Sequence, residues 1–447
     1  ADLAIYEKLM GLDEEALARR ALAANAFSAA ALQERIPIAD PERFFSGRGW
    51  RSDVTDSDKL ELFRRAMATI SSYEEKAGLC KRPEEVDPDW LYAPVWPTVN
   101  HHYANWGIEA RTFPELIQQF GILRFGRRPR VGDTFSGGGS IPFEAARIGC
   151  DVFASDLNPI ACMQTWSALN IAGAPADYAH KLDQIQEQIA ELVNSEIESL
   201  GIERDASGNY LKAHLYCLET KCPESGWMVP LSPSWLISKK RGVIARLVED
   251  HENRRFDIEI IIGASSSELS RAEKGTIRDG NLVYNIGARE FSVPIKTIRG
   301  EYRDSEGETK NRLRLWEQAD FRPRPEDVLQ ERVYAVQWFR RQSVKSKRPE
   351  SFFAPFLQSD SDRERRIESI VATNIAEWQR TGLTPDMPIE TGKENEGPIR
   401  TNGWTYWHHM FTPRQLLVMS ILKKSAAKVD PQLLPLLISK FADNNSK

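Results

Sequence analysis

Hydrophobic residues recur at three- and four-residue steps through the first part of the chain, the spacing that gathers them on one face of a helix. The pattern begins at Leu3 and predicts a helix over residues 1–32. A second stripe, from Leu60 to Ile70, predicts a helix over residues 57–75. We therefore expect residues 1–95 to form a helical N-terminal region.

The pattern changes between residues 96 and 204, where short apolar strands alternate with helical stretches. Strands are expected at 130–133 and 151–155, and helices at 112–120, 141–148, 159–171 and 176–200. Thr112, followed by a proline in the first turn, is a typical helix N-cap. Strand–turn–helix alternation of this kind indicates an α/β fold with a parallel sheet.

From residue 205 to residue 325 the apolar positions alternate with a period of two. Strands are expected at 256–262, 282–286 and 291–298, which makes this stretch a β-rich insertion. After Pro325 the pattern predicts helix again, over 361–380 with Ser361 as N-cap and over 413–429. Residues 326–447 are thus expected to be a helical region that returns to the α/β core.

Composition narrows the class of protein. The net charge of −5 argues against a uniformly basic nucleic-acid binder, although local basic strips remain compatible with it. No apolar run is long enough to span a membrane, and no secretory signal opens the chain, so we expect a cytoplasmic protein without membrane contact. Five irregularly spaced cysteines fit a reducing compartment.

The strongest chemical signal is the glycine-rich loop Asp133-Thr-Phe-Ser-Gly-Gly-Gly-Ser140. It joins an expected strand to an expected helix, and glycines permit backbone conformations and close approaches that a Cβ would prevent. Asp156 ends the next strand, where a carboxylate can accept hydrogen bonds from ribose hydroxyls. Together these features favour a nucleoside-bearing cofactor over an ordinary strand-to-helix corner with a capping aspartate.

The D-x-F-x-G-x-G-S loop resembles motif I of amino-group DNA methyltransferases. The longer run from Gly137 to Ala161 resembles the large adenine-specific DNA methylases that carry a zinc ribbon, some of which occur in bacterial anti-phage gene clusters. Residues 112–116, 235–240 and 411–417 extend the similarity, which covers the chain from about residue 95 to its end.

The resemblance implies a Rossmann-like S-adenosylmethionine-dependent methyltransferase core over residues 96–204. It implies that the cofactor-binding residues are Asp133, Thr134, Phe135, Ser136, Gly137, Gly138, Gly139, Asp156, Leu157 and Asn158. Asp156 would bind the ribose hydroxyls and Leu157 would pack on adenine, whereas Asn158 is first of all a helix N-cap. The expected cofactor is S-adenosylmethionine, and the expected partners are double-stranded DNA and other subunits of a defence complex.

The chain departs from this family in its catalytic signature, an acidic or amide residue followed by Pro-Pro and an aromatic. It contains no Pro-Pro dipeptide, and the nearest sequences, 87–90 and 232–235, lack the second proline and are expected to be structural. We therefore assign no catalytic residue. In the family the signature follows the segment that resembles 411–415, so the end of the chain inside an expected helix suggests a C-terminally cut fragment.

The zinc ribbon is degenerate as well. Cys217 and Cys222 stand where its first ligand pair would be, but no second pair follows, and tetrahedral zinc requires four ligands. We expect no metal and read both cysteines as small hydrophobic residues. A cytosine-C5 mechanism needs a nucleophilic cysteine, commonly after proline, and no Pro-Cys occurs.

Basic residues interleaved with aromatics are candidates for nucleic-acid contact. The two strips comprise Arg127, Arg128, Arg130, Arg340, Arg341, Lys345 and Lys347. A third candidate comprises Arg312, Arg314, Trp316, Arg322 and Arg324. For each strip the alternative is a solvated surface. Residues 404–409 could line a base pocket, but an aromatic run of this kind favours buried packing. By analogy, the 205–325 insertion would recognise the target.

The leading hypothesis is an adenine-specific DNA methyltransferase, or its cofactor-binding portion, that transfers a methyl group from S-adenosylmethionine to the exocyclic amine of adenine. One alternative is a catalytically incomplete module that binds S-adenosylmethionine and DNA within a larger complex. Another alternative keeps methyl transfer and changes the acceptor to RNA or protein.

Overall fold

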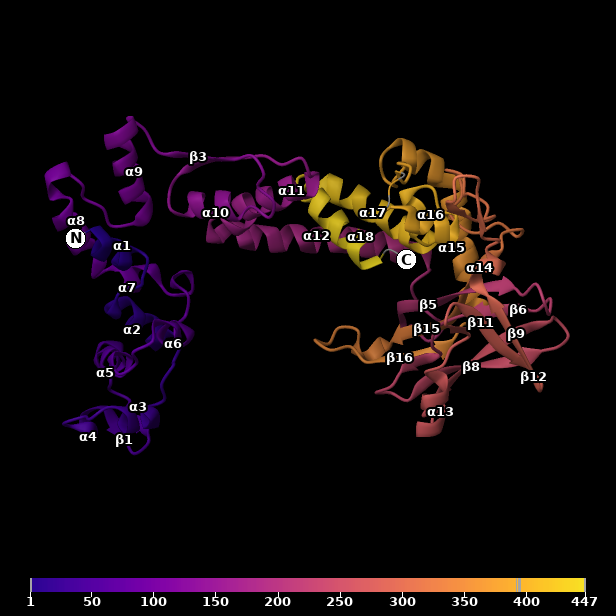
Figure 1. Cartoon of the computed structure of the whole chain (residues 1–447), viewed down its shortest axis with the longest axis horizontal. Coiled ribbons are helices and arrows are strands. Elements are labelled where there is room, and N and C mark those ends of the chain that lie inside the picture. The colour runs from indigo at the N-terminus through magenta and orange to yellow at the C-terminus, as the bar shows by residue number, and fades with distance from the viewer. Residues whose placement is uncertain (1, 391, 393–394, 446–447) are drawn as a thin grey trace. The chain divides into compact units, whose positions relative to one another are not determined.

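The computed structural model describes residues 2–390, 392 and 395–445. Contacts divide the chain into two compact units, Ala1–Ala179 and His180–Lys447 (Figure 1). Helices and strands are mixed, with seven strands joined in one sheet of the second unit. The fold therefore combines α and β elements, as the sequence predicts at this coarse level.

The first unit is mostly helical. Its helices are α1 (Asp2–Leu9), α2 (Glu14–Ala23), α3 (Ala29–Arg35), α4 (Pro41–Phe44), α5 (Asp56–Ala68), α6 (Tyr73–Gly78), α7 (Pro88–Tyr92), α8 (Val95–His102), α9 (Phe113–Phe125), α10 (Ser140–Arg147) and α11 (Pro159–Ser167). Its strands are β1 (Phe45–Ser46), β2 (Gly49–Trp50), β3 (Arg130–Asp133) and β4 (Asp151–Ala154). The main core lies between α2, α3 and α5, where Leu17, Leu32 and Phe63 are buried.

The expected single helix over residues 1–32 is wrong, because local stop and start signals divide it. Gly11 takes a left-handed φ of +66°, and Asp13 then caps α2 by accepting from the N–H of Ala16 at 3.2 Å. Ser28 caps α3. The helix expected at 57–75 is divided in the same way, since Ser72 caps a separate α6.

The second unit is richer in strands. They are β5 (Tyr210–Lys221), β6 (Met228–Leu231), β7 (Leu236–Ser238), β8 (Val243–Asp250), β9 (Arg255–Ile262), β10 (Ile277–Arg278), β11 (Asn281–Ile286), β12 (Arg289–Pro294), β13 (Tyr302–Arg303), β14 (Thr309–Lys310), β15 (Leu329–Phe339) and β16 (Ser351–Pro355). The helices are α12 (Ala176–Leu200), which begins in the first unit, α13 (Ser266–Ala272), α14 (Ile295–Ile298), α15 (Gln358–Arg380), α16 (Glu396–Asn402), α17 (Pro413–Val429) and α18 (Leu434–Asn445).

The large sheet has the strand order β16-β15-β5-β6-β9-β8-β7. In the described chain its neighbouring strands are antiparallel except β6 and β9, which are parallel. Strand β15 pairs with β5 along nearly its whole length. The sequence predicts helix after Pro325, and the structure corrects this: β15 and β16 complete the sheet of the insertion.

A second sheet, β10-β11-β12, packs against the large one through an apolar layer. Phe256 of β9 meets Tyr284 of β11, and Tyr284 stacks on Phe291 with ring centroids 5.3 Å apart. The strand expected at 291–298 ends at Pro294, where the chain turns into the short helix α14. A proline cannot donate a ladder hydrogen bond, which explains the early end.

Helices α12, α15 and α17 form a second apolar layer, in which Ile202, Ile367 and Leu416 are fully buried. Arg414 of α17 ties this layer together: it forms ion pairs with Glu203 and Glu364 and donates to the carbonyl of Ile202 at 3.2 Å. Three segments distant in sequence are therefore joined by one guanidinium.

Helix α15 starts three residues earlier than the sequence predicts. Its N-cap position is Leu357, and the Asp360 carboxylate accepts from the Leu357 N–H at 2.7 Å. Ser361 is inside the helix, so its assignment as N-cap is wrong. Aspartate in the first turn gains from the helix dipole, which favours the earlier start. Within the described residues, no helix is both long and apolar enough to cross a membrane.

Candidate cofactor-binding site

The glycine-rich loop follows β3, the first of two adjacent parallel strands, β3 and β4. Val131 pairs with Val152, and Asp133 pairs with Ala154. In a parallel pair the carboxyl ends of both strands lie at the same edge, so Asp133 and Asp156 are brought to one end of the sheet. The strands expected at 130–133 and 151–155 are confirmed to within one residue, as is the N-cap role of Thr112 on α9.

Two of the three loop glycines have left-handed backbones, with φ of +51° at Gly137 and +82° at Gly139. A Cβ on Gly139 would lie 2.9 Å from the Cα of Thr165 in α11, so this position also needs the smallest residue for packing. Gly138 differs from both. Its φ is ordinary, and a Cβ there would meet no atom of the described residues within 4 Å.

The loop is held from below by hydroxyl groups. Ser136 is buried, its N–H donates to the carbonyl of Ser155 at 3.1 Å, and its Oγ accepts from Thr165 Oγ1 at 3.1 Å. Thr165 was not foreseen as part of the site, because no spacing in the sequence relates it to residue 136. The contact fixes the loop against α11.

Asp156 closes the loop from the second strand. Its Oδ2 accepts from the Gly137 N–H at 2.9 Å, and its Oδ1 accepts from the Asn158 N–H at 2.8 Å. These hydrogen bonds, from Asn158 first and then Gly137, hold the pKa of the Asp156 carboxyl below its ordinary value. Each carboxylate oxygen keeps one further lone pair, and the residue is half-buried with part of its surface open to solvent, so Asp156 can accept from a ligand.

The remaining loop residues have mixed roles. Asp133 Oδ1 accepts from the N–H of Phe135 at 3.1 Å, which shapes the turn after β3, while Thr134 is exposed. Asn158 caps α11 by accepting from the Ile160 N–H at 2.9 Å, as predicted. All ten sequence-predicted residues thus lie at one end of the β3–β4 pair.

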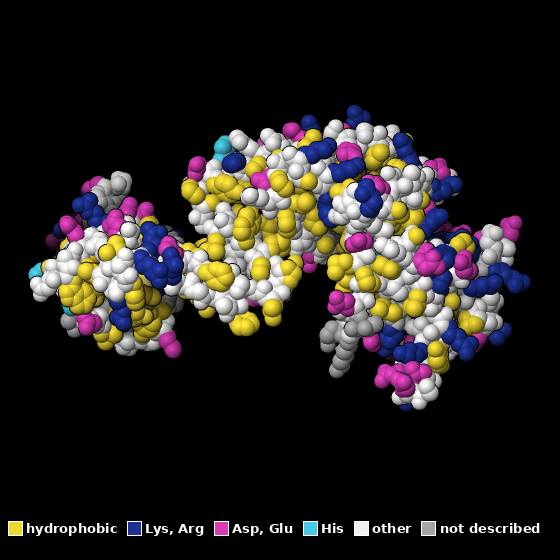
Figure 2. All heavy atoms as spheres, turned by 90° about the horizontal axis from the view of Figure 1, so that it is seen from above, with side chains coloured by type: hydrophobic (Ala, Val, Ile, Leu, Met, Phe, Trp, Pro, Cys, Tyr) yellow, Lys and Arg dark blue, Asp and Glu magenta, His cyan; other side chains and the backbone are white. Residues whose placement is uncertain are grey.

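The site is bordered by exposed apolar side chains. Phe135 is 77% exposed and Leu157 is 92% exposed, although both are large hydrophobic residues. Ile141, Phe153 and Ile160 are exposed nearby in sequence. Figure 2 shows hydrophobic side chains crowded on the visible face over the part of the chain that contains α10 and α11. Exposed apolar surface of this extent is typical of a binding site.

Helix α10 starts directly above the loop without a side-chain cap. Gly139 occupies its N-cap position, and the following Ser140 and Ile141 have backbone N–H groups for which no helical acceptor exists. Such donors favour a carboxylate or another anionic group.

Some of the side chains in the two basic strips named from the sequence lie near carboxylates, and others do not. Arg128 approaches Asp151 at 3.8 Å, while Arg127 and Arg130 are exposed at the start of β3. Arg340 approaches Glu350 at 3.4 Å and lies over Phe352, and Arg341 follows it at the end of β15. Lys345 and Lys347 are exposed in the loop toward β16. The first strip belongs to the first unit and the second strip to the second unit.

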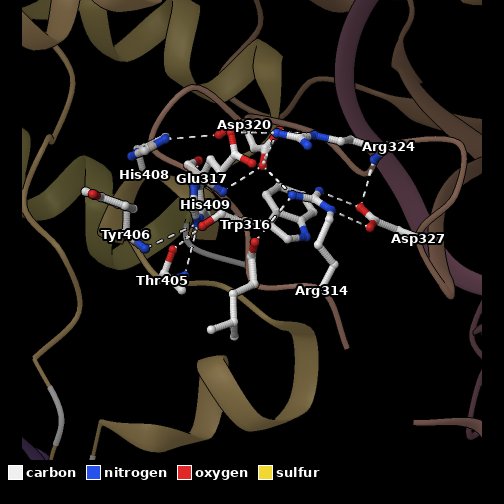
Figure 3. Close-up of polar contacts among 11 residues, drawn as sticks. Arg314, Trp316, Glu317, Asp320, Arg324, Asp327, Thr405, Tyr406, His408 and His409 are labelled. Atoms are coloured by element: carbon white, nitrogen blue, oxygen red, sulfur yellow. Dashed lines mark hydrogen bonds and ion pairs between the residues drawn. The ribbon is translucent and has the colours of Figure 1, made fainter. Parts of the chain in front are cut away.

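The third basic candidate is wrong for two of its arginines. Arg314 pairs with Asp320 and Asp327, each at 2.6 Å, and Arg324 pairs with Asp320 at 2.9 Å (Figure 3). We call these four residues the arginine cluster. Burial alone would raise the pKa of Asp320, but hydrogen bonds from Arg314 and from the Glu317 N–H hold it low. The charges of both guanidinium groups are thus met by carboxylates of the chain itself.

Residues 404–409 pack against the arginine cluster, as the aromatic run predicts. His408 and His409 are fully buried, and their Nε2 atoms donate to the carbonyls of Asp320 and Glu317 (Figure 3). His409 Nδ1 accepts from two backbone N–H groups, at Thr405 and Tyr406, which fixes its tautomer. Trp404 and both histidines are buried, so this segment packs into the fold as the aromatic run predicts.

The two sequences nearest to a catalytic signature have local structural roles. Asp87 caps α7 by accepting from the Trp90 N–H at 2.8 Å. Ser232 Oγ donates to the carbonyl of Ser234 at 2.6 Å, and Ser234 Oγ donates to the carbonyl of Ala272 at 3.1 Å. All three side chains are therefore engaged in local hydrogen bonds to the backbone.

Cys217 and Cys222 are buried at the end of β5, in agreement with their interpretation as small hydrophobic residues. Burial raises the pKa of the Cys217 thiol to about 12, which keeps it protonated. No group of three or more histidine, cysteine, aspartate or glutamate side chains in the described part of the chain is placed to hold a metal.

Comparisons with known proteins add no relative. No protein-family model, curated protein or solved structure matches the chain significantly.

Proposed function

We propose that the chain binds S-adenosylmethionine at the end of β3 and β4 and is an adenine-specific DNA methyltransferase or the cofactor-binding portion of one. The Rossmann-like methyltransferase core expected from the sequence is part of this proposal. The observation that carries it is Asp156: a half-buried carboxylate, held by two backbone N–H groups across from a glycine loop, with acceptor capacity left over.

The residues present fit the cofactor. Two hydroxyls of a ribose can donate to the free lone pairs of Asp156, which stays ionised because its pKa is lowered. Leu157 and Phe135 offer apolar faces to an adenine ring, and the N–H groups at the start of α10 suit the methionine carboxylate. Gly138 leaves open space over the loop, since a Cβ there would meet no atom of the described residues within 4 Å. When bound, the sulfonium supplies the methyl group for transfer to an amine.

A second candidate is a binding module that retains S-adenosylmethionine and DNA without catalysing transfer. The absence of any Pro-Pro dipeptide in the 447 residues favours it, because the family uses a proline carbonyl to accept a hydrogen bond from the target amine. Methylation of duplex DNA by the chain, followed by nucleoside analysis, separates the two: N6-methyladenine supports the enzyme, and its absence with cofactor binding intact supports the module.

Calorimetric titration tests the cofactor site directly. S-adenosylhomocysteine and its 2′-deoxy analogue are titrated into the parent chain and into Asp156→Ala. Loss of hydrogen bonds to a charged acceptor should weaken binding of the full ligand by roughly tenfold to a hundredfold. The analogue should lose less affinity on this substitution than the full ligand does, because one of the two hydroxyls that would donate to Asp156 is already missing.

Asp151→Ala is the matched control. Asp151 is an exposed aspartate at the opposite end of the same strand, so its loss removes an equal charge without touching the loop. It should leave the affinity unchanged. Equal binding by the parent and Asp156→Ala, or equal weakening by both variants, would overturn the cofactor assignment.

A further inference from the structure

An open groove of about 650 Å³ lies in the second unit between the two sheets. Its floor is apolar and includes Ile244, Leu247 and Val283, from β8 and β11. Helix α13 borders it beside β8 (Figure 1). The groove belongs to none of the basic strips named from the sequence.

Three cations stand on its rim within eight residues. Arg271 ends α13, Lys274 follows in the loop, and Arg278 ends β10; all three side chains line the groove and are exposed. In the described chain none of them forms an ion pair within 4 Å, and Arg278 makes one hydrogen bond, from Nε to the Gly275 carbonyl at 2.9 Å. Their charges are therefore available to a ligand.

Three acidic side chains also line the groove; Glu290 is exposed, while the other two are engaged by the chain itself. Glu268 caps α13 by accepting from Ser265, and Glu249 accepts from the Gly287 N–H at 2.8 Å and approaches His251 at 2.9 Å. Arg246, a further cation of the lining, pairs with Glu259 at 2.6 Å. The unpaired charge on the rim is thus mainly positive, which is the electrostatic complement of a polyanion.

The loop that carries these cations is fixed in place. A Cβ on Gly275 would lie 2.0 Å from the carbonyl oxygen of Ser232, so the two backbones touch. Thr276 Oγ1 donates to the carbonyl of Pro230 at 2.6 Å, and the Trp235 N–H donates to the carbonyl of Ala272 at 2.7 Å. A rigid loop loses little entropy when a ligand binds.

Trp235 supplies an independent sign of a ligand. Its side chain lines the groove and is 6% exposed, and its Nε1 is a buried donor with no acceptor among the described residues. A buried donor without a partner costs free energy that an acceptor on a ligand would recover.

A second large cleft, of about 600 Å³, makes a useful contrast. Three of its four arginines have close carboxylate partners: Arg322 pairs with Glu368, Arg332 with Glu219 at 3.2 Å, and Arg365 with Asp362 at 2.7 Å. The fourth, Arg255, approaches Asp257 at 4.0 Å. Of the two cavities, the groove beside α13 is the one whose cations remain without carboxylate partners.

We propose that this groove binds the phosphodiester backbone of duplex DNA, with Arg271, Lys274 and Arg278 contacting phosphates. The choice of DNA among polyanions rests on the proposed function. Arginine forks match phosphate oxygens, and contacts to the backbone position a protein on the duplex without selecting a base sequence. The groove would thus set where the β-rich unit holds DNA.

The test is the salt dependence of binding to a fluorescently labelled 20-base-pair duplex, measured by anisotropy with the full chain. Removing all three cations, by Arg271→Ala, Lys274→Ala and Arg278→Ala together, should raise Kd at least about tenfold at 0.1 M salt. The slope of log K against log salt should become shallower by about 2.7, for three lost phosphate contacts.

A control variant with Arg48→Ala, Lys81→Ala and Lys424→Ala removes the same charge from exposed positions elsewhere. It should retain nearly the parent affinity and slope. Unchanged duplex binding by the groove variant, equal losses in both variants, or no binding by the parent would each overturn the proposal. So would displacement of the duplex by polyglutamate of equal charge, because the occupant would then be an acidic polypeptide.

Titration with S-adenosylmethionine on the same preparations keeps the two proposals apart. The groove variant should bind the cofactor as the parent does, and a circular dichroism spectrum and urea-unfolding midpoint equal to the parent's show that its second unit is folded. If the chain binds cofactor but its duplex binding does not depend on the groove, only the proposal for the groove is contradicted. A chain whose duplex binding depends on the groove but which binds no cofactor contradicts the proposed function alone.

Discussion

Asp156 and Asp320 have the same side chain and lowered pKa values, yet they differ in whether their carboxylate oxygens keep lone pairs for a ligand. Asp156 is half-buried and accepts from two backbone N–H groups, with lone pairs left over. Asp320 is buried and receives two guanidinium groups and one N–H. A carboxylate whose acceptors are filled by its own chain stabilises the fold, whereas one that is only oriented by its chain can bind a ligand.

The largest effect should come from Asp320→Ala. It leaves Arg314 and Arg324 partly buried beside an empty position, and removing one partner of a buried pair costs about 3 kcal/mol or more of unfolding free energy. Urea unfolding followed by circular dichroism measures the change. Asp362→Ala, which breaks an exposed pair, should leave the midpoint nearly unchanged. Equal effects of the two substitutions would contradict the role given to the arginine cluster.

Gly138 and Gly139, two of the three glycines of the cofactor loop, allow a second comparison between a role in the fold and a role in binding. Gly139→Ala combines a left-handed φ with a clash against Thr165, so it should cost about 3 kcal/mol of unfolding free energy. Gly138→Ala meets nothing in the described chain and should leave the unfolding midpoint almost unchanged, while it weakens S-adenosylmethionine binding about tenfold or more. A Gly138→Ala chain that binds cofactor normally would show that no ligand lies over this residue.

The smallest effect concerns pH. Burial lowers the pKa of His214, a β5 residue that faces Glu364 at 3.7 Å, to about 3. The imidazole of His214 is therefore protonated below about pH 6.5 in the unfolded chain, whereas in the folded chain it stays neutral at that pH. Stability contributed by neutral His214 is complete above that pH and declines as pH falls toward 3. Between pH 7 and pH 5 the loss should be about 2 kcal/mol.

His214→Gln should flatten this part of the stability curve, measured by urea unfolding at each pH. Cofactor affinity should behave differently and stay level over the same range, because the lowered pKa keeps Asp156 ionised. A parallel decline of both properties would contradict the separation of site and scaffold.

The sequence was most informative where a local pattern decides the structure. A strand, three glycines, a helix and a second strand ending at an acid predicted both the β3–β4 pair and the position of Asp156, because parallel pairing forces their ends together. Caps such as Thr112 and Asn158 followed from local hydrogen bonding in the same way.

The pattern of hydrophobic and polar residues could not predict features that depend on pairing between segments distant in sequence. Strand β15 alternates charged and apolar residues weakly, and its pairing with β5, about a hundred positions earlier, decides its conformation. The groove cations were missed for a related reason: Arg271, Lys274 and Arg278 form no basic run, and only the contact of Gly275 with Ser232 places them on one rim. The prediction for Arg314 was wrong in the opposite sense: a basic residue that the sequence offered for nucleic-acid contact is half-buried and paired with two aspartates.

The guanidinium of Arg414 also has a consequence for the order in which the protein is made. It bonds the carbonyl of Ile202, 212 positions earlier in the chain. A ribosome that adds 5–20 residues per second needs roughly 10–40 s to cover that distance. Early in that interval β5 lacks its partner strand β15, and until its end it lacks helix α17, which carries Arg414. The incomplete sheet would therefore expose apolar residues that chaperones can bind.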